Sequence, residues 1–129
     1  MASAKVRAEV LRKLLRAGAR SRIERLVDRL HPPDIAAMLT ELAPEESRAV
    51  VDVLFSAHRA ARTLRELPGE LLPGILDVLP DKQVVEMLER LPPDDAVGFL
   101  EVLPEERRLR VTGGLPVTRK SELERLLSY

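Results

Sequence analysis

Residues 79–104 read LPDKQVVEMLERLPPDDAVGFLEVLP, and the leucine–proline pair at their start returns twice, each time after twelve residues. The same period extends along most of the chain. We call the positions that follow one another at twelve-residue intervals, from 32 to 116, the slots of the period. Seven of these eight slots hold proline, at Pro32, Pro44, Pro68, Pro80, Pro92, Pro104 and Pro116. Ser56 fills the one vacant slot, and a leucine stands one or two residues before each slot. A fixed period over eight units indicates a repeat architecture.

Each unit of the repeat predicts one short helix. Val84, Leu88 and Leu91 are spaced i, i+4, i+7, which places them on one helical face. Proline suits the first turn of a helix and ends the helix before it, and Ser56 can replace it as an N-cap. Helices this short need neighbours to cover their apolar face, which favours a stacked α-solenoid. We therefore predict an all-α fold of about ten helices, two at 3–17 and 20–30 and eight more to the C-terminus.

Two places depart from the regular unit. Pro73 and Gly74 lie inside the unit that begins at Pro68, which predicts a kink or turn followed by a short helix at 74–79. Gly113 and Gly114 close the unit that begins at Pro104, where glycine suits the end of a helix. Neither the pair nor its surroundings fit a phosphate loop, because no strand precedes it and no lysine follows in the required place.

Length and composition predict one soluble intracellular domain over residues 1–129. A chain of 129 residues with 45% apolar residues can bury a continuous core. The sequence has no apolar run long enough for a membrane span and does not begin like a signal peptide. It contains no cysteine, which excludes disulfides, thiolate metal sites and a cysteine nucleophile.

The net charge is zero, but the first thirty residues are strongly basic. Residues 1–30 hold nine Lys and Arg against three acidic residues, whereas residues 31–129 hold twelve basic and eighteen acidic ones. This asymmetry is compatible with contact between the N-terminal helices and an anionic surface. In the alternative, the basic residues only form the solvated side of a helix, at Lys5, Arg12, Arg16 and Arg20. The apolar side of that helix would then consist of Val6, Val10, Leu11, Leu14 and Leu15. No aromatic residue interleaves the basic ones, so nucleic acid is not an expected partner.

The proline-rich turns resemble the cytoplasmic N-terminal domain of the MgtE magnesium channels. The resemblance is carried by Leu30-His31-Pro32-Pro33-Asp34-Ile35-Ala36 and by Leu91-Pro92-Pro93-Asp94-Asp95-Ala96, and it covers roughly residues 20–129. It implies a right-handed superhelix of short helices that docks on a pair of CBS domains when magnesium is plentiful. It also implies that Mg²⁺ held by carboxylates between the two domains keeps a membrane pore closed, and that Tyr129 stands where the CBS domains would follow.

The resemblance makes Asp94 and Asp95 the candidate Mg²⁺ ligands of this chain. It places Gly98 and Arg62 where the family can carry further carboxylates. The expected partners are CBS domains of the same or another chain, at the cytoplasmic face of a membrane that the chain itself does not cross, and any dimer would form through the full-length protein. In the alternative, Asp94 and Asp95 only offset the helix dipole, as the acidic first turns of other units do.

A second class of function is a protein–protein adaptor with no ion sensing. The helical repeats of the flagellar motor switch protein FliG resemble this family, and such a scaffold would need no CBS domains beyond Tyr129. An enzyme is not expected. His31 and His58 are too far apart in sequence to form a helical metal pair, and neither belongs to a recognisable nucleophile–base pair. Met38 and Met87 are predicted to be core residues.

Overall fold

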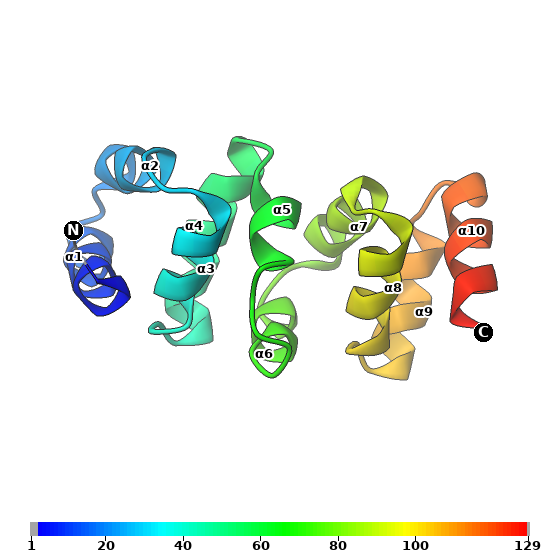
Figure 1. Cartoon of the computed structure of the whole chain (residues 1–129). Coiled ribbons are helices and arrows are strands. Elements are labelled where there is room, and N and C mark those ends of the chain that lie inside the picture. Colours follow the sequence, from blue (N-terminus) through cyan, green and yellow to red (C-terminus); the bar gives the residue numbers. More distant parts are fainter. Residues whose placement is uncertain (1–2, 129) are drawn as a thin grey trace. The chain divides into compact units, whose positions relative to one another are not determined.

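The computed structural model describes residues 3–128 and is all-α, with no strand among those residues (Figure 1). The prediction of ten helices is confirmed. The helices are α1 (Ala4–Arg16), α2 (Arg20–Asp28), α3 (Pro32–Leu39), α4 (Pro44–Ser56), α5 (Ala60–Leu64), α6 (Leu72–Asp77), α7 (Asp81–Arg90), α8 (Pro93–Glu101), α9 (Glu105–Gly113) and α10 (Val117–Leu127).

The chain divides into two compact units, Met1–Leu71 with α1 to α5 and Leu72–Tyr129 with α6 to α10. In the first unit α1 packs against α2, α3 and α4, while α3 packs against α5. In the second unit α7 packs against α8 and α9, and α8 packs against α10. Helices thus contact mainly their next or next-but-one neighbours along the chain, as helical repeats do. The hand of the predicted superhelix and its single-domain character stay predictions.

Six of the seven repeated prolines begin a helix, in two slightly different ways, whereas Pro68 opens a turn. Pro32 and Pro44 are the first residues of α3 and α4, as predicted. Pro80, Pro92 and Pro104 lie one position earlier, as the N-caps of α7, α8 and α9, with ψ between 147° and 152°. The N-cap residue has extended backbone, and proline adopts this conformation without strain because its φ is already fixed.

The prediction that Ser56 is an N-cap is wrong. Ser56 is the last residue of α4, and its hydroxyl donates to the carbonyl of Asp52 at 3.2 Å. Because no proline interrupts the chain there, α4 continues for thirteen residues and α5 keeps only five. His58 lies in the turn between these two helices, with a left-handed φ of 57°.

The irregular unit after Pro68 begins its helix earlier than predicted. A turn occupies residues 68–71, and α6 starts at Leu72 and not at Gly74. Pro73 falls in the first turn of α6, where its missing N–H has no intrahelical partner to lose. Leu72, Ile75 and Leu76 are buried, and this apolar face explains why the short helix forms.

The apolar face of α1 is narrower than predicted. Ala8 and Leu11 are fully buried, but Val6 and Val10 are 52% and 43% exposed. Arg12, which we placed on the solvated side, is half-buried and pairs with Glu46 of α4 at 3.0 Å. The packing of α1 against α3 and α4 covers only the strip around Leu11, so the two valines remain at the surface.

The cores of the two units consist largely of apolar residues that recur at helical spacing along the repeat. Met38 and Met87 are fully buried, as predicted, and so are Leu88 and Leu100. Among the residues described, no helix combines the length and the apolar character that crossing a membrane requires.

Candidate functional site

The two predicted magnesium ligands lie side by side at the start of α8. Pro92 is the N-cap and Pro93 the first residue of the helix, so Asp94 and Asp95 occupy its first turn. Ala96, Phe99 and Leu100 are buried, and they fix the helix in the second unit. Asp94 is exposed and Asp95 is half-buried. Part of this carboxylate pair is therefore accessible to a cation or a partner.

Gly98 follows one helical turn after Asp94 on α8. A Cβ atom built at Gly98 would meet no other atom within 4 Å. The space beside the carboxylate pair therefore admits a side chain that this sequence does not supply. Arg62, the other position where the resemblance implies a carboxylate, is exposed on α5 in the first unit.

The donor atoms of this surface suit Mg²⁺, but only as part of a site. Carboxylate oxygens are the ligands that Mg²⁺ prefers, and one or two of them often suffice because the ion keeps several waters. Within residues 3–128, no group of three or more His, Cys, Asp or Glu side chains is arranged to hold a metal ion. The positive end of the α8 dipole also opposes a cation near its first turn. Asp94 and Asp95 therefore fit one half of a magnesium site.

The histidines do not join this surface. His31 is exposed at the N-cap of α3, and its side chain makes no capping hydrogen bond. His58 is exposed in the turn before α5. Both lie in the first unit, whereas Asp94 and Asp95 belong to the second.

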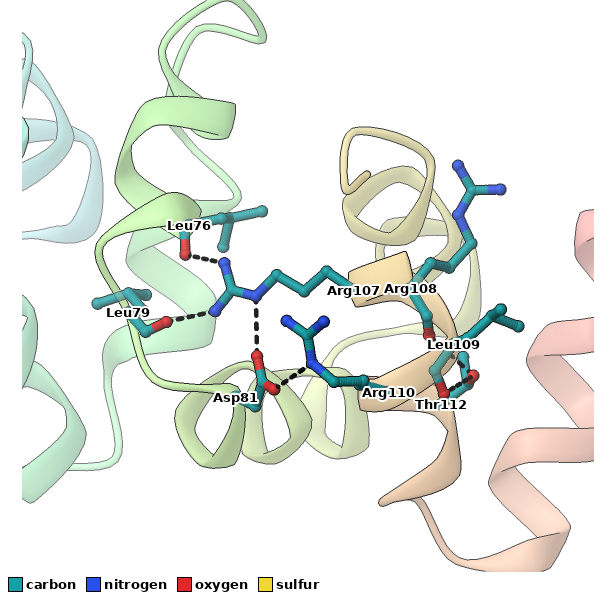
Figure 2. A network of polar contacts seen from close by, with 8 residues as sticks. All are labelled: Leu76, Leu79, Asp81, Arg107, Arg108, Leu109, Arg110 and Thr112. Atoms are coloured by element: carbon teal, nitrogen blue, oxygen red, sulfur yellow. Dashed lines mark hydrogen bonds and ion pairs between the residues drawn. The ribbon is translucent and has the colours of Figure 1, made fainter. Parts of the chain in front are cut away.

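A polar network of the second unit centres on Arg107 of α9 (Figure 2). Its guanidinium donates to the carbonyl of Leu76 at 2.5 Å and to the carbonyl of Leu79, both at the end of α6. A third bond reaches Asp81 of α7 at 2.8 Å. The second oxygen of Asp81 accepts from Arg110 at 3.0 Å. One side chain thus closes the end of one helix and binds the start of the next.

The same arrangement recurs twelve residues later. Arg119 of α10 donates to the carbonyls of Leu88 and Leu91 at the end of α7. In the first unit Arg59 donates to the carbonyl of Val27 at 3.1 Å and to that of Leu30 at 2.5 Å. The last carbonyls of a helix lack their full set of partners within the helix, and these arginines add donors there. The carbonyls of Val27 and Leu76 also accept the backbone N–H groups of Leu30 and Leu79.

Sequence reasoning missed these arginines, although the repeat carried a signal. Arg59, Arg107 and Arg119 each stand three residues after a slot of the twelve-residue period. Their acceptors lie 28 to 32 residues earlier in the chain. The recurrence of arginine at this place in the unit is therefore the sequence signal of these helix-end contacts.

Such networks shift the pKa values of two carboxylates. Hydrogen bonds from Arg107 and Arg110 lower the pKa of Asp81 below its ordinary value. The pKa of Glu46 is also lowered, first by the backbone N–H of Ala43, which donates to it at 2.9 Å, and then by Arg12. Neither group lies at the α8 surface, so both shifts concern stability.

Comparison with known proteins identifies the family. The family model described as the MgtE intracellular N domain matches residues 30–129. The structure is also similar to the crystal structure of the cytosolic domain of the Mg²⁺ channel MgtE in complex with ATP, with a TM-score of 0.79 and 29% sequence identity. That match covers 95% of this chain and 50% of the solved chain, so this chain spans half the length of that relative. The chain matches none of the curated proteins. It belongs to the family of MgtE intracellular N domains.

Proposed function

We propose that this chain is the cytoplasmic regulatory domain of a magnesium transporter or channel and that it docks on CBS domains in response to Mg²⁺. The observation that carries the proposal is the family match over residues 30–129, together with the similarity to the cytosolic domain of a Mg²⁺ channel. Regulation by docking requires no catalytic group, so the proposal does not make the chain an enzyme.

Asp94 and Asp95 are the proposed ligands on this side of the docked interface. They are adjacent, on the first turn of a helix that buried residues hold in place, and Asp94 is exposed. Two acidic surfaces repel each other until a cation lies between them, so an ion that binds only the docked state shifts the equilibrium towards docking. Since the partner would supply the remaining ligands, this chain alone should bind Mg²⁺ weakly or not at all.

The test is a magnesium titration of a protein that joins this domain to CBS domains. Small-angle scattering or limited proteolysis should report compaction as Mg²⁺ rises, and calcium serves as the control ion. Asp94→Asn and Asp95→Asn should each raise the Mg²⁺ concentration required. Glu105→Gln with Glu106→Gln is the matched control, because these residues form an exposed acidic pair at the start of the neighbouring α9.

Gly98 and Arg62 favour a second candidate, a protein–protein adaptor without ion sensing. At both positions this chain lacks a carboxylate that the resemblance implies. If neither divalent ion changes the two-domain protein, or if the Asp94 and Asp95 variants respond like the parent, the adaptor replaces the sensor.

A further inference from the structure

Three arginines form a stripe along the outer side of α2 and its C-cap residue, Arg29. Arg22, Arg25 and Arg29 are spaced i, i+3, i+7 and all are exposed. Ile23 and Val27 are buried on the opposite side, and they fix the helix with its arginines outward. This spacing brings three positive charges onto one face of a helix about two turns long.

The neighbouring α1 presents a similar exposed face. Lys5, Lys13 and Arg16 are exposed on the side away from the buried Ala8 and Leu11. Val6 and Val10 lie on the same outer side, and both are exposed. Since α1 packs against α2, the two helices together carry six exposed cations and two exposed valines.

These six cations differ from the other basic residues of the first thirty. Arg7 pairs with Asp34, Arg12 with Glu46 and Glu9, and Arg20 with Glu24. Within the described part of the chain, the remaining six form neither a hydrogen bond nor an ion pair through their side chains, although the charge of Arg16 contributes to lowering the pKa of Glu46. We call this set the basic face; its members are Lys5, Lys13, Arg16, Arg22, Arg25 and Arg29. It has no structural role of the kind that Arg59, Arg107 and Arg119 have.

We propose that the basic face binds the surface of an anionic membrane. Basic residues beside exposed apolar ones are typical of helices that lie at a lipid interface. Residues 1–30 carry a surplus of six positive charges and residues 31–129 an equal surplus of negative ones, nine minus three against twelve minus eighteen. An anionic surface therefore attracts the first two helices and repels the rest of the chain.

Charge and composition separate this partner from nucleic acid. No aromatic residue occurs in residues 1–30, so the face offers no platform on which bases could stack. The similar solved structure is the cytosolic domain of a channel, a protein that works beside a membrane. The proposal does not rest on magnesium docking, because it involves neither Asp94 nor Asp95.

The test is sedimentation of the whole chain with lipid vesicles in the presence of EDTA. The chain should bind vesicles of phosphatidylcholine that contain phosphatidylglycerol and should not bind pure phosphatidylcholine. Each basic residue near an anionic surface contributes a factor of about five in partitioning. Replacing the stripe by Arg22→Glu, Arg25→Glu and Arg29→Glu should therefore weaken binding by about 100-fold or more. Salt near 1 M should abolish binding, because screening then acts over about 3 Å.

The matched control makes the same change of net charge elsewhere. Arg48→Glu, Arg62→Glu and Arg125→Glu replace three exposed arginines outside the basic face, and this variant should bind far better than the stripe variant. Circular dichroism checks that both fold. If the stripe variant does not fold, Lys5→Gln with Lys13→Gln takes its place, with an expected loss of about 25-fold.

Three results would overturn the proposal. The first is equal binding to neutral and anionic vesicles, or no binding to either at low salt. The second is an equal loss in the stripe variant and its control, which would reflect net charge alone. The third is self-association in sedimentation velocity that the stripe variant abolishes while vesicles bind nothing, because the partner would then be a second copy of the chain. Since EDTA removes Mg²⁺, none of these results bears on the magnesium titration.

Discussion

Replacement of Arg107 by alanine should destabilise the second unit more than any exposed arginine change. The Arg107 side chain is 11% exposed, and its guanidinium binds the carbonyl of Leu76 in α6, the carbonyl of Leu79 just after α6 and one oxygen of Asp81. A hydrogen bond to a charged group contributes about 1.5–3 kcal/mol, and three such bonds set an upper limit of about 9 kcal/mol. Water can reach the freed acceptors at a helix end, so we expect a loss of about 3 kcal/mol in the free energy of unfolding.

Arg110 provides the matched control for this change. It lies on the same helix and binds the same Asp81, but its side chain is 57% exposed and contacts Asp81 through a single nitrogen. Arg110→Ala should therefore cost less than about 1 kcal/mol. Arg107→Lys keeps the charge but cannot span three acceptors with one nitrogen, so its loss should be intermediate.

Urea denaturation followed by circular dichroism measures these differences, and amide exchange locates them. The amide of Leu79, which donates to the carbonyl of Leu76 at 3.1 Å, should exchange faster in Arg107→Ala than in Arg110→Ala. The reasoning fails if Arg107→Ala loses no more stability than Arg110→Ala, because the buried carbonyl contacts would then contribute nothing.

Three further predictions concern packing, pH and glycine. Leu100→Ala, at a fully buried site, should cost about 2–5 kcal/mol in urea denaturation, whereas Leu109→Ala, at a site 67% exposed, should cost less than about 0.5 kcal/mol. The pKa of Asp81 is lowered in the folded state, so the stabilisation by its carboxylate is present above the ordinary carboxyl pKa and is lost as the pH falls through the lowered one. Asp81→Asn should therefore flatten the acid limb of a curve of unfolding free energy against pH. An unchanged acid limb would contradict this prediction. Gly98→Ala should raise the melting temperature, since its Cβ meets open space and alanine favours helix by about 1 kcal/mol, whereas Gly114→Ala should lower it, since its Cβ would lie 3.1 Å from a valine of α7.

Most of the fold was predictable because each unit of the repeat carries its own local signals for a helix. Proline and leucine at twelve-residue intervals mark where helices begin and which face is buried, and both signals act within one helical turn. The errors arose at positions where only one residue preference supported the prediction. Ser56 was interpreted by its capping preference, but without proline nothing stopped α4 from continuing. Val6 and Val10 were expected on the apolar side of the first helix, but the packing of α1 against α2, α3 and α4 leaves them exposed.

The candidate site was less predictable for a physical reason. Asp94 and Asp95 were located correctly at the start of a helix, but their role depends on ligands that another domain would supply, and a single sequence does not contain them. Arg107 reaches acceptors about thirty residues away, and only the packed helices bring these groups together. Its identity at a fixed place in the repeat was visible, whereas its partners were not.

The backward reach of these arginines bears on how the chain folds as it leaves the ribosome. The end of α6 is synthesised before Arg107, and the end of α7 before Arg119, in each case by about thirty residues. At about 5–20 residues per second, each helix end waits roughly 2–6 s for the side chain that closes it. The helices should therefore become stable one after another from the N-terminus. Each new arginine stabilises the end of a helix that was synthesised about thirty residues earlier.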